Sequence, residues 1–374
     1  MTRHVGFLFL GPAAHIAHAA TVAFELDAMP GYRATALVSS AAHARTIEDL
    51  AMRYGSGCRL ERLQAGPLHR LLRLFKRRAH PRVRYVLRHN RHRLRGFDAL
   101  VSPDAYANLH HLRCGPRMVL AGHGAGLRTH GRYPGMDAFD LFLLPGRTKL
   151  ERLEQMGYVD PDRCRIIGYP KFDVVASRRA GQLFDNDNPV VLYNPHFNLR
   201  ESSWPHWGRQ VLDWFLAHPR YNLIFAPHVL LPAHARLRLA RRHLHAANIH
   251  VDLDSPALID MTYTGLADIY LGDISSQVYE FVGHCPRPCI FLDPHRRPWR
   301  DNPNLHMWRM GTVLDDLAGL GQALQGARES FGAYRGEQRA AVAAAFDIGD
   351  VPAGRRGALA IADLLEPTAG ASPG

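Results

Sequence analysis

Asp185-Asn186-Asp187-Asn188-Pro189-Val190-Val191-Leu192-Tyr193 divides the sequence into two similar halves. Its first five residues are polar and turn-forming, which is typical of a linker between domains. Its last four are apolar or aromatic, which predicts a buried strand at 190–193. Short apolar runs alternate with helical segments on both sides of this stretch. The sequence therefore predicts two successive α/β domains.

The first half, residues 1–184, has the alternation that is typical of an open parallel sheet. Helical segments are predicted at 14–28 and 148–156. Apolar runs bounded by turn residues predict strands at 5–10, 34–39, 99–102, 118–121, 139–144 and 165–168. Strands that are separated by helices indicate βαβ units, whose strands run parallel.

The second half, residues 185–366, repeats this pattern as a second domain. Strands are predicted at 190–193, 223–226, 249–253, 269–271 and 289–292, and helices at 207–217, 233–247 and around 278–282. We expect residues 367–374, a tail rich in small residues, to be disordered. The predicted fold class is α/β, with two doubly wound, Rossmann-like parallel sheets facing across a cleft, an architecture known as GT-B.

Composition narrows the classes of partner and compartment. The chain has 46 Lys and Arg against 34 Asp and Glu, a net charge of +12 that favours anionic partners. The five cysteines are scattered and odd in number, so we expect no disulfide framework and a reducing cytoplasm. No apolar run reaches the roughly 18–20 residues that span a membrane, and residues 5–10 are too short for a secretory signal.

The positive charge is concentrated in residues 59–95, which hold thirteen Arg or Lys and one acid, Glu61. Within 68–78, apolar side chains spaced like one face of a helix are flanked by cations; they are Leu68, Leu71, Leu72 and Phe75. This pattern suits a basic amphipathic helix on an anionic membrane surface. It suits equally a domain helix whose stripe faces the core. Nucleic acid is the weaker alternative, because zinc-finger spacing and interleaved aromatic residues are missing.

Candidate site residues follow predicted strands, where open parallel sheets bind their ligands. Gly122-His123-Gly124, with Arg128 close behind, comes directly after strand 118–121. Glycines let backbone amides approach a phosphate. An imidazole, whose pKa lies near 6.5, can take a proton from an attacking hydroxyl. We interpret His123 as a catalytic base rather than as a solvated histidine in a tight turn.

The second half offers a matching position at Pro227-His228, after strand 223–226. His228 can donate to a phosphate oxygen and stabilise negative charge there. A strand-end histidine that bonds only to backbone explains the same pattern equally well. Asn194-Pro195-His196-Phe197-Asn198 follows strand 190–193 and is predicted at the rim of the cleft, without an assigned chemistry.

A third candidate, Asp273-Ile274-Ser275-Ser276, joins strand 269–271 to the helix around 278–282. Ser275 and Ser276 can cap that helix, whose free amides and positive dipole end form an anion site. N-capping without a ligand is the alternative. Glu280 lies one turn further and can accept from ribose hydroxyls or face solvent.

Together these segments resemble the CDP-glycerol glycerophosphotransferase family, the teichoic-acid primases and polymerases. Five motifs occur in the family's order, and they are His123-Gly124, Gly168-Tyr169-Pro170-Lys171-Phe172-Asp173, Tyr193-Asn194-Pro195, Pro227-His228 and Asp273-Ile274-Ser275-Ser276. The resemblance implies a GT-B enzyme in which an acceptor hydroxyl attacks the β-phosphorus of CDP-glycerol and releases CMP. It also implies a membrane-linked or carbohydrate acceptor in cell-envelope polymer synthesis.

By the same resemblance, His123 is the base, His228 binds or stabilises the diphosphate, and Ser275 with Ser276 holds donor phosphate or ribose. Membrane association through a basic amphipathic helix also occurs in such enzymes, which favours a peripheral location on the inner face of the plasma membrane. Neither a cofactor nor a nucleic-acid partner is expected.

The sequence departs from the family's pattern in three segments. Ala125-Gly126-Leu127-Arg128 stands where Thr-Pro-Leu-Lys is usual, and Pro195-His196-Phe197-Asn198 lacks the usual Arg. Val229 follows His228 where Pro is common. A sugar nucleotide used by a glycosyltransferase or a UDP-GlcNAc 2-epimerase-like enzyme is therefore the alternative donor. A non-catalytic module that binds lipid or RNA is the alternative of another class.

Metal binding is not predicted. His15-Ile16-Ala17-His18 and His243-Leu244-His245 pair histidines at short spacing, but neither has a carboxylate or cysteine nearby in the sequence at ligand spacing. Walker-type, GxGxxG and G-x-S-x-G motifs are also missing from the sequence. We therefore favour a metal-independent mechanism.

Overall fold

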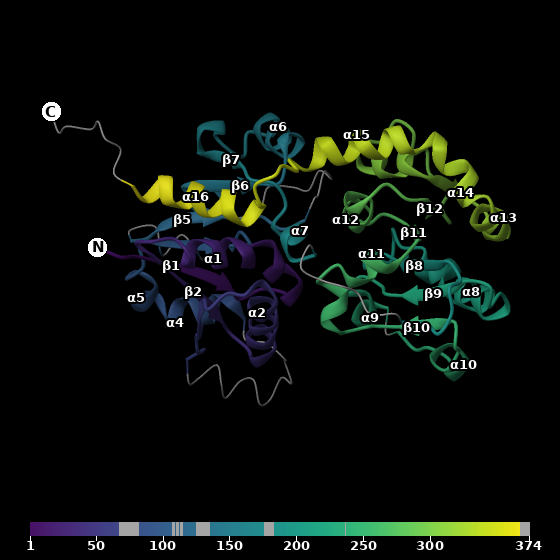
Figure 1. Ribbon diagram of the computed structural model, residues 1–374, viewed down its shortest axis with the longest axis horizontal. Coiled ribbons are helices and arrows are strands. Elements are labelled where there is room, and N and C mark those ends of the chain that lie inside the picture. The colour runs from purple at the N-terminus through teal and green to yellow at the C-terminus, as the bar shows by residue number, and fades with distance from the viewer. Residues whose placement is uncertain are drawn as a thin grey trace. The chain divides into compact units, whose positions relative to one another are not determined.

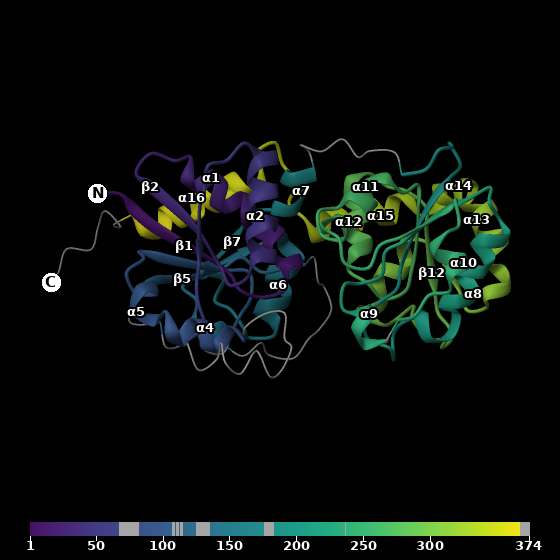
Figure 2. The ribbon, with the colours of Figure 1, turned by 90° about the horizontal axis from the view of Figure 1, so that it is seen from below.

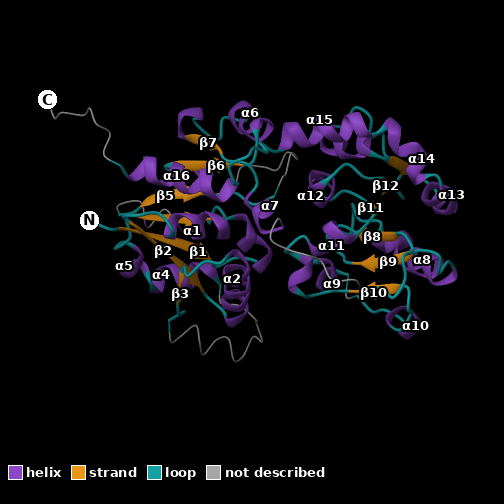
Figure 3. Ribbon diagram, in the orientation of Figure 1, coloured by secondary structure: helices purple, strands orange, loops and turns teal. Residues whose placement is uncertain are grey.

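A computed structural model describes residues 1–66, 82–106, 109, 112, 115–124, 135–175, 183–235 and 237–366. The described chain forms two compact units. The first unit contains residues 1–124, 135–175 and 346–366, and the second contains 183–345. Each unit is built on one parallel sheet covered by helices (Figures 1 and 3).

The sheet of the first unit has seven parallel strands in the order β3-β2-β1-β4-β5-β6-β7. Their bounds are β1 Arg3–Phe9, β2 Tyr32–Val38, β3 Arg59–Arg62, β4 Ala99–Ser102, β5 Arg117–Leu120, β6 Leu141–Leu144 and β7 Cys164–Ile166. The chain winds outward in one direction from β1 to β3 and in the other from β4 to β7. The switch point therefore lies between the carboxyl ends of β1 and β4, which is where such sheets bind ligands.

Helices cover both faces of this sheet, because successive strand residues point to opposite sides. Phe7 packs in a cluster with residues of α1, α2 and α16, whereas Leu8 packs with residues of α4, α5 and α6. The helices of the unit are α1 Ala20–Asp27, α2 Ala41–Tyr54, α4 Val83–His89, α5 Arg91–Leu94, α6 Arg147–Gln155, α7 Pro170–Val175 and α16 Ala353–Leu365. Each fully buried Phe or Leu side chain contributes about 1.5–3 kcal/mol to this core.

The second unit has six parallel strands in the order β10-β9-β8-β11-β12-β13. Their bounds are β8 Val190–Asn194, β9 Asn222–Phe225, β10 Ile249–Val251, β11 Ile269–Gly272, β12 Cys289–Leu292 and β13 Thr312–Leu314. Its helices are α8 Trp204–Ala217, α9 Leu231–His234, α10 Arg241–Leu244, α11 Thr262–Leu266, α12 Gln277–His284, α13 Leu320–Gln325, α14 Ala327–Ser330 and α15 Arg335–Ala345. The switch point here lies between β8 and β11.

The last helix returns to the first unit, whereas the sequence had placed residues 185–366 together in the second domain. Ala358 and Ile361 of this helix, α16, pack in the core of the first unit, and Asp173, the final residue of the Gly-Tyr-Pro motif, holds its start. Its carboxylate accepts hydrogen bonds from the backbone N–H groups of Ala353 and Gly354, at 3.1 and 2.6 Å, and so caps the N-terminus of α16. Figures 1 and 2 show α16 lying beside α1 in both views.

Other elements differ in detail from the prediction. The helix expected at 14–28 is a 3₁₀ helix, Ala13–His18, followed by α1. The prediction of a single helix at 233–247 was wrong, because two short helices, α9 and α10, occupy that region. The edge strands β3 and β13 were not predicted.

Three predicted features lie outside the described residues: the apolar stripe at 68–78, Arg128 and the tail 367–374. Within the part that the structure does describe, none of the helices combines the length and the apolar character needed to cross a membrane.

Candidate functional site

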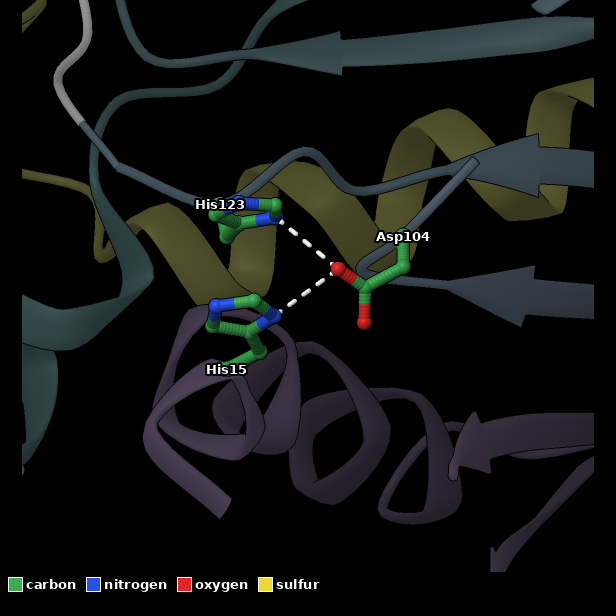
Figure 4. Close-up of side chains that lie close together, drawn as sticks. All are labelled: His15, Asp104 and His123. Atoms are coloured by element: carbon green, nitrogen blue, oxygen red, sulfur yellow. Dashed lines mark hydrogen bonds and ion pairs between the residues drawn. The ribbon is translucent and has the colours of Figure 1, made fainter. Parts of the chain in front are cut away.

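His123 lies just beyond the carboxyl end of β5, next to the switch point of the first sheet. The rest of its surroundings come from two other strand ends. His15, on the 3₁₀ helix that follows β1, stacks its ring on that of His123 with centroids 3.7 Å apart and planes 11° apart. Asp104, just after β4, places one carboxylate oxygen 2.8 Å from Nδ1 of His15 and 3.1 Å from Nδ1 of His123 (Figure 4).

The hydrogen bonds of this cluster define which ring nitrogens carry protons. Nδ1 of His123 also lies 3.0 Å from the carbonyl oxygen of Pro103, and a carbonyl oxygen can only accept. An ionised Asp104 can likewise only accept, so Nδ1 of both His123 and His15 carries a hydrogen. In the neutral rings, each Nε2 is then left with a lone pair that can take a proton.

Asp104 is ionised because the imidazoles favour its charged form. Burial by itself raises its pKa, but the hydrogen bonds from His123 and His15 outweigh burial and hold the pKa of Asp104 well below its usual range. The hydroxyl of Tyr106 donates to the other carboxylate oxygen at 2.8 Å. Both oxygens of the carboxylate are therefore held in place.

The two stacked imidazoles have pKa values shifted in opposite directions. Burial lowers the pKa of His123, but the hydrogen bond and charge of Asp104 more than compensate, so the pKa of His123 is raised. In His15, burial outweighs the bond to Asp104, and the nearby His123 lowers its pKa further. Of the two rings, His123 is therefore the one that takes up a proton first.

Gly11, two residues beyond β1, leaves the space that the cluster occupies. A Cβ atom there would meet the carboxylate of Asp104 and would lie 2.5 Å from the hydroxyl oxygen of Tyr106. Because these two groups are held by hydrogen bonds, any larger residue at position 11 would displace them.

The same cluster is a candidate metal centre by composition. One ring nitrogen each of His15 and His123 and an oxygen of Asp104 lie within 4.8 Å of one another. A zinc ion binds about 2.0–2.1 Å from an imidazole nitrogen, along the lone pair in the plane of the ring. One ion cannot lie in the planes of two stacked, nearly parallel rings, so a metal would require one ring to rotate. The observed geometry fits a hydrogen-bonded cluster better than a metal centre.

Beside the cluster, His123 lines a small cavity of about 70 Å³. Its wall is mainly apolar and includes Leu120, Met136 and Phe142, whereas Lys149 near the start of α6 contributes an ammonium group. Burial, and to a lesser extent the charge of Arg152, lowers the pKa of Lys149. A cavity of this size can hold a hydroxyl-bearing end of a ligand next to His123, whose side chain is 41% exposed.

Sequence reasoning found His123 but missed His15, Asp104 and Gly11. His15 was dismissed because no carboxylate lies near it in the sequence, yet Asp104 reaches it from 89 residues away. The available signal was positional: Gly11 and Asp104 directly follow strands that were predicted correctly. Residues at neighbouring strand ends of a parallel sheet meet at one edge.

In the second unit, Asp273 organises the switch point from a fully buried position. Its carboxylate accepts backbone N–H groups of His196, at 2.9 Å, and of Ser203, at 2.6 Å, as well as the Ser203 hydroxyl at 2.9 Å. Burial raises the pKa of Asp273 to about 6, although these bonds oppose the shift. Asp273 therefore positions the loops after β8 and β11, and its own carboxylate is occupied by protein groups.

His228 lies next to His196 in the same unit, with ring centroids 5.9 Å apart, and Phe197 lies 4.6 Å from the His228 ring. Nδ1 of His228 accepts the backbone N–H of Leu230 at 3.3 Å. In the neutral ring, Nε2 therefore carries the hydrogen and can donate. This is the tautomer that binding of a phosphate oxygen requires.

The serines after Asp273 differ in what they do. The hydroxyl of Ser275 accepts the backbone N–H of Gln277 at 3.3 Å, so it caps the first turn of α12. Ser276 precedes the first residue of α12, but its side chain makes no capping hydrogen bond. Ser275 and Glu280 are buried, whereas Ser276 is half-buried, which makes its hydroxyl the more accessible of the pair.

Neither a protein-family model nor a curated protein sequence matches the chain. Its structure is similar to a variant of the wall teichoic acid polymerase TagF, with 15% identity and a TM-score of 0.66 over 97% of this chain and 88% of that one. It is also similar to UDP-GlcNAc 2-epimerase from Neisseria meningitidis bound to UDP-GlcNAc (13% identity, TM-score 0.60, 98% and 99% covered). A third similar structure is a putative UDP-N-acetylglucosamine 2-epimerase from Listeria monocytogenes. It has 16% identity and a TM-score of 0.64 over 98% of this chain and 97% of that one. The two parallel sheets and these similarities confirm the predicted α/β, GT-B-like fold class.

Proposed function

We propose that this protein is a transferase that moves a glycerol-phosphate or related polyol-phosphate unit from a CDP-activated donor to a membrane-linked or carbohydrate acceptor. The enzyme would act in cell-envelope polymer synthesis, and it would be located in the cytoplasm at the inner face of the plasma membrane. The proposal rests on the surroundings of His123. Asp104 raises the pKa of this histidine and holds its Nδ1, while no described residue bonds to its Nε2.

In the proposed reaction, the acceptor hydroxyl gives its proton to Nε2 of His123 as its oxygen attacks the β-phosphorus of the donor. The new bond joins acceptor oxygen to phosphorus, and the bond from that phosphorus to the bridging oxygen breaks, so that CMP leaves. Asp104 stabilises the imidazolium that forms, because its carboxylate accepts from Nδ1. The site needs no further oxidant or co-reactant.

The donor would bind to the second unit. The Nε2–H group of His228 can donate to the diphosphate, and the amides at the start of α12, beside Ser276, can bind a phosphate oxygen. Gly122 and Gly124 of the first unit, and Pro227, Ser275 and Glu280 of the second, are proposed as further donor contacts. Arg128, which lies outside the described residues, is proposed as a donor contact from the sequence alone. Asp273 acts through the loops that it positions.

Separate incubations with CDP-glycerol, UDP-sugars and CMP-sugars, with the released nucleotide measured, test this function. CMP release from CDP-glycerol that depends on an added acceptor supports the proposal. UDP release from UDP-GlcNAc would instead support the epimerase-like or glycosyltransferase alternative, which the structural similarity to UDP-GlcNAc 2-epimerases favours. Binding to liposomes or RNA without any nucleotide turnover would point to a non-catalytic module.

The pH dependence of the rate should report on His123. The rate should rise with pH and level off above the raised pKa of His123, since only the neutral ring accepts a proton. In Asp104→Asn the charge that stabilises protonated His123 is gone, while burial still lowers the pKa of His123. The midpoint of the rate profile should therefore move to lower pH. Profiles of kcat measured from about pH 5 to about pH 9 give this midpoint.

Asp162→Asn is the matched control, because Asp162 is an exposed acid of the same unit, remote in sequence from the cluster. It should leave the profile unchanged. An Asp104→Asn midpoint that stays in place or moves to higher pH would show that Asp104 does not set the pKa of the base.

A further inference from the structure

His18 lies beside the cluster of His15, Asp104 and His123 but has no role in the chemistry described so far. It stands one turn after His15 on the same 3₁₀ helix, Ala13–His18. Its ring centroid lies 6.3 Å from that of His123 and 6.5 Å from that of His15. The candidate site of the first unit therefore contains three neighbouring imidazoles.

The two ring nitrogens of His18 differ in their surroundings. Nδ1 is buried and makes no hydrogen bond with any described residue. Nε2 also lacks a bond to the described part of the chain, but it is not shielded from solvent as Nδ1 is, and His18 as a whole is 6% exposed. A buried polar atom without a partner is costly and rare in folded proteins. A contact with a ligand through Nε2 explains why an imidazole, and not an apolar ring, stands at this position.

Burial keeps the His18 ring neutral. The pKa of His18 is lowered well below its usual value, first by burial and next by the charge of Lys171. A neutral imidazole carries one hydrogen. On Nδ1 this hydrogen would be a buried donor without an acceptor, which folded proteins avoid. The hydrogen therefore belongs on Nε2, and His18 can donate from that atom.

The charged groups around His18 favour a negatively charged acceptor for this hydrogen bond. Lys171, in the first turn of α7, is buried and has the largest charge effect on His18, followed by His123 and His15 in their protonated forms. Asp104 acts in the opposite direction, but its effect is the smallest of these, and its oxygens already accept hydrogen bonds within the cluster. An oxyanion beside Nε2 would therefore lie in a positive field.

An aromatic cluster of the same unit holds His18 in place. The rings of Tyr169 and His18 form a T-shaped pair with centroids 5.2 Å apart. The ring of Phe346 lies 4.7 Å from that of Tyr169 and 4.9 Å from that of Phe172. Tyr169 and Phe346 are both buried. A donor that is fixed in this way needs little reorganisation when it binds charge.

We infer that His18 is a third imidazole of the site, and that its Nε2–H group donates to a non-bridging oxygen of the phosphoryl group that is transferred. That the oxyanion belongs to the transferred group rests on the proposed function, whereas binding of an oxyanion by His18 does not. The bonds that form and break are those of the proposed reaction. His123 takes the proton of the attacking hydroxyl, and His18 keeps its own proton throughout.

Calorimetric titration with glycerol phosphate, which carries a phosphoryl oxyanion, tests this inference without turnover. His18→Phe keeps a buried ring but removes both nitrogens. It should weaken binding at least roughly tenfold, the effect of losing a hydrogen bond to a charged group. His18→Gln, whose amide N–H group can reach the position of Nε2, should restore part of the affinity. In acceptor-dependent CMP release, kcat of His18→Phe should also fall at least roughly tenfold.

His4→Phe is the matched control, because His4 is exposed at the amino end of β1, at the edge of the sheet opposite the site. It should bind glycerol phosphate as the unaltered protein does. Unchanged binding in His18→Phe, or equal losses in His18→Phe and His4→Phe, would overturn the inference. Failure of the unaltered protein to bind glycerol phosphate would also overturn it.

Urea unfolding separates a binding role from a structural one. Phenylalanine has no nitrogen to leave without a partner, so the free energy of unfolding of His18→Phe should be at least that of the unaltered protein. Weaker binding that accompanies a loss of stability in both His18→Phe and His18→Gln would assign His18 a packing role instead.

The titrations also separate this inference from the proposed function. His18-dependent binding of glycerol phosphate by a protein that releases no CMP from CDP-glycerol would refute the proposed reaction and leave the oxyanion contact standing. CMP release with unaltered binding and kcat in His18→Phe would do the reverse.

Discussion

Replacing His123 by alanine should lower kcat for acceptor-dependent CMP release roughly 10²- to 10⁴-fold, the usual contribution of a general base. The substitution removes the only imidazole of the described cluster whose pKa is raised, and leaves Asp104 and His15 in place. The expected change lies in kcat rather than in KM for the donor, because the proposed donor contacts lie mainly in the second unit. Initial rates at a saturating donor concentration measure this loss in kcat.

His245→Ala is the matched control, because His245 is exposed and belongs to neither cluster of site residues. It should retain full activity. His15→Phe preserves an aromatic ring against His123 but removes one hydrogen bond to Asp104, so its activity should fall less than that of His123→Ala. If His123→Ala stays within about tenfold of the unaltered protein, His123 is not the base.

Replacing Asp273 by alanine should reduce the free energy of unfolding of the second unit by roughly 3–5 kcal/mol. The backbone N–H groups of His196, Ser203 and Ile274 all donate to this carboxylate, and each costs about 1–3 kcal/mol when it is buried without a partner. Urea unfolding followed by tryptophan fluorescence measures the loss, because Trp308 donates to the carbonyl oxygen of Asp273.

Two further variants test the cause of this loss. Asp187→Ala removes an exposed acid from the segment before β8 and should change stability by no more than about 0.5 kcal/mol. Asp273→Asn keeps one carbonyl oxygen for His196 and Ile274 but turns a donor toward Ser203, so its loss should be intermediate. Similar stability of Asp273→Ala and the unaltered protein would mean that the carboxylate does not hold the two loops together.

Most strands of both sheets could be predicted because each leaves a local pattern. Residues 99–101 and 289–292 are apolar throughout, as is typical of strands covered on both faces, and the structure has strands at Ala99–Ser102 and Cys289–Leu292. The strands that were missed lie at sheet edges. Arg59–Arg62 has a single apolar residue, Leu60, among three charged ones and is only partly buried, so it lacks the apolar run by which the others were found.

The return of the last helix could not be predicted, because its cause is a long-range contact. Asp173 was recognised as part of a motif, but its partners, the N–H groups of Ala353 and Gly354, are about 180 residues away. The prediction that His123 and His228 converge on one diphosphate stays a prediction. The structure describes each of these histidines within its own unit.

The sequence by itself determined the α/β class, the two halves and the position of His123 after a strand, because periodicity and turn residues act between neighbours along the chain. Only the tertiary structure decided that Asp104 and His15 would join His123. The carboxyl ends of β1, β4 and β5 lie side by side through the order of strands in the sheet. That order is set by packing of whole elements, which no short stretch of sequence encodes.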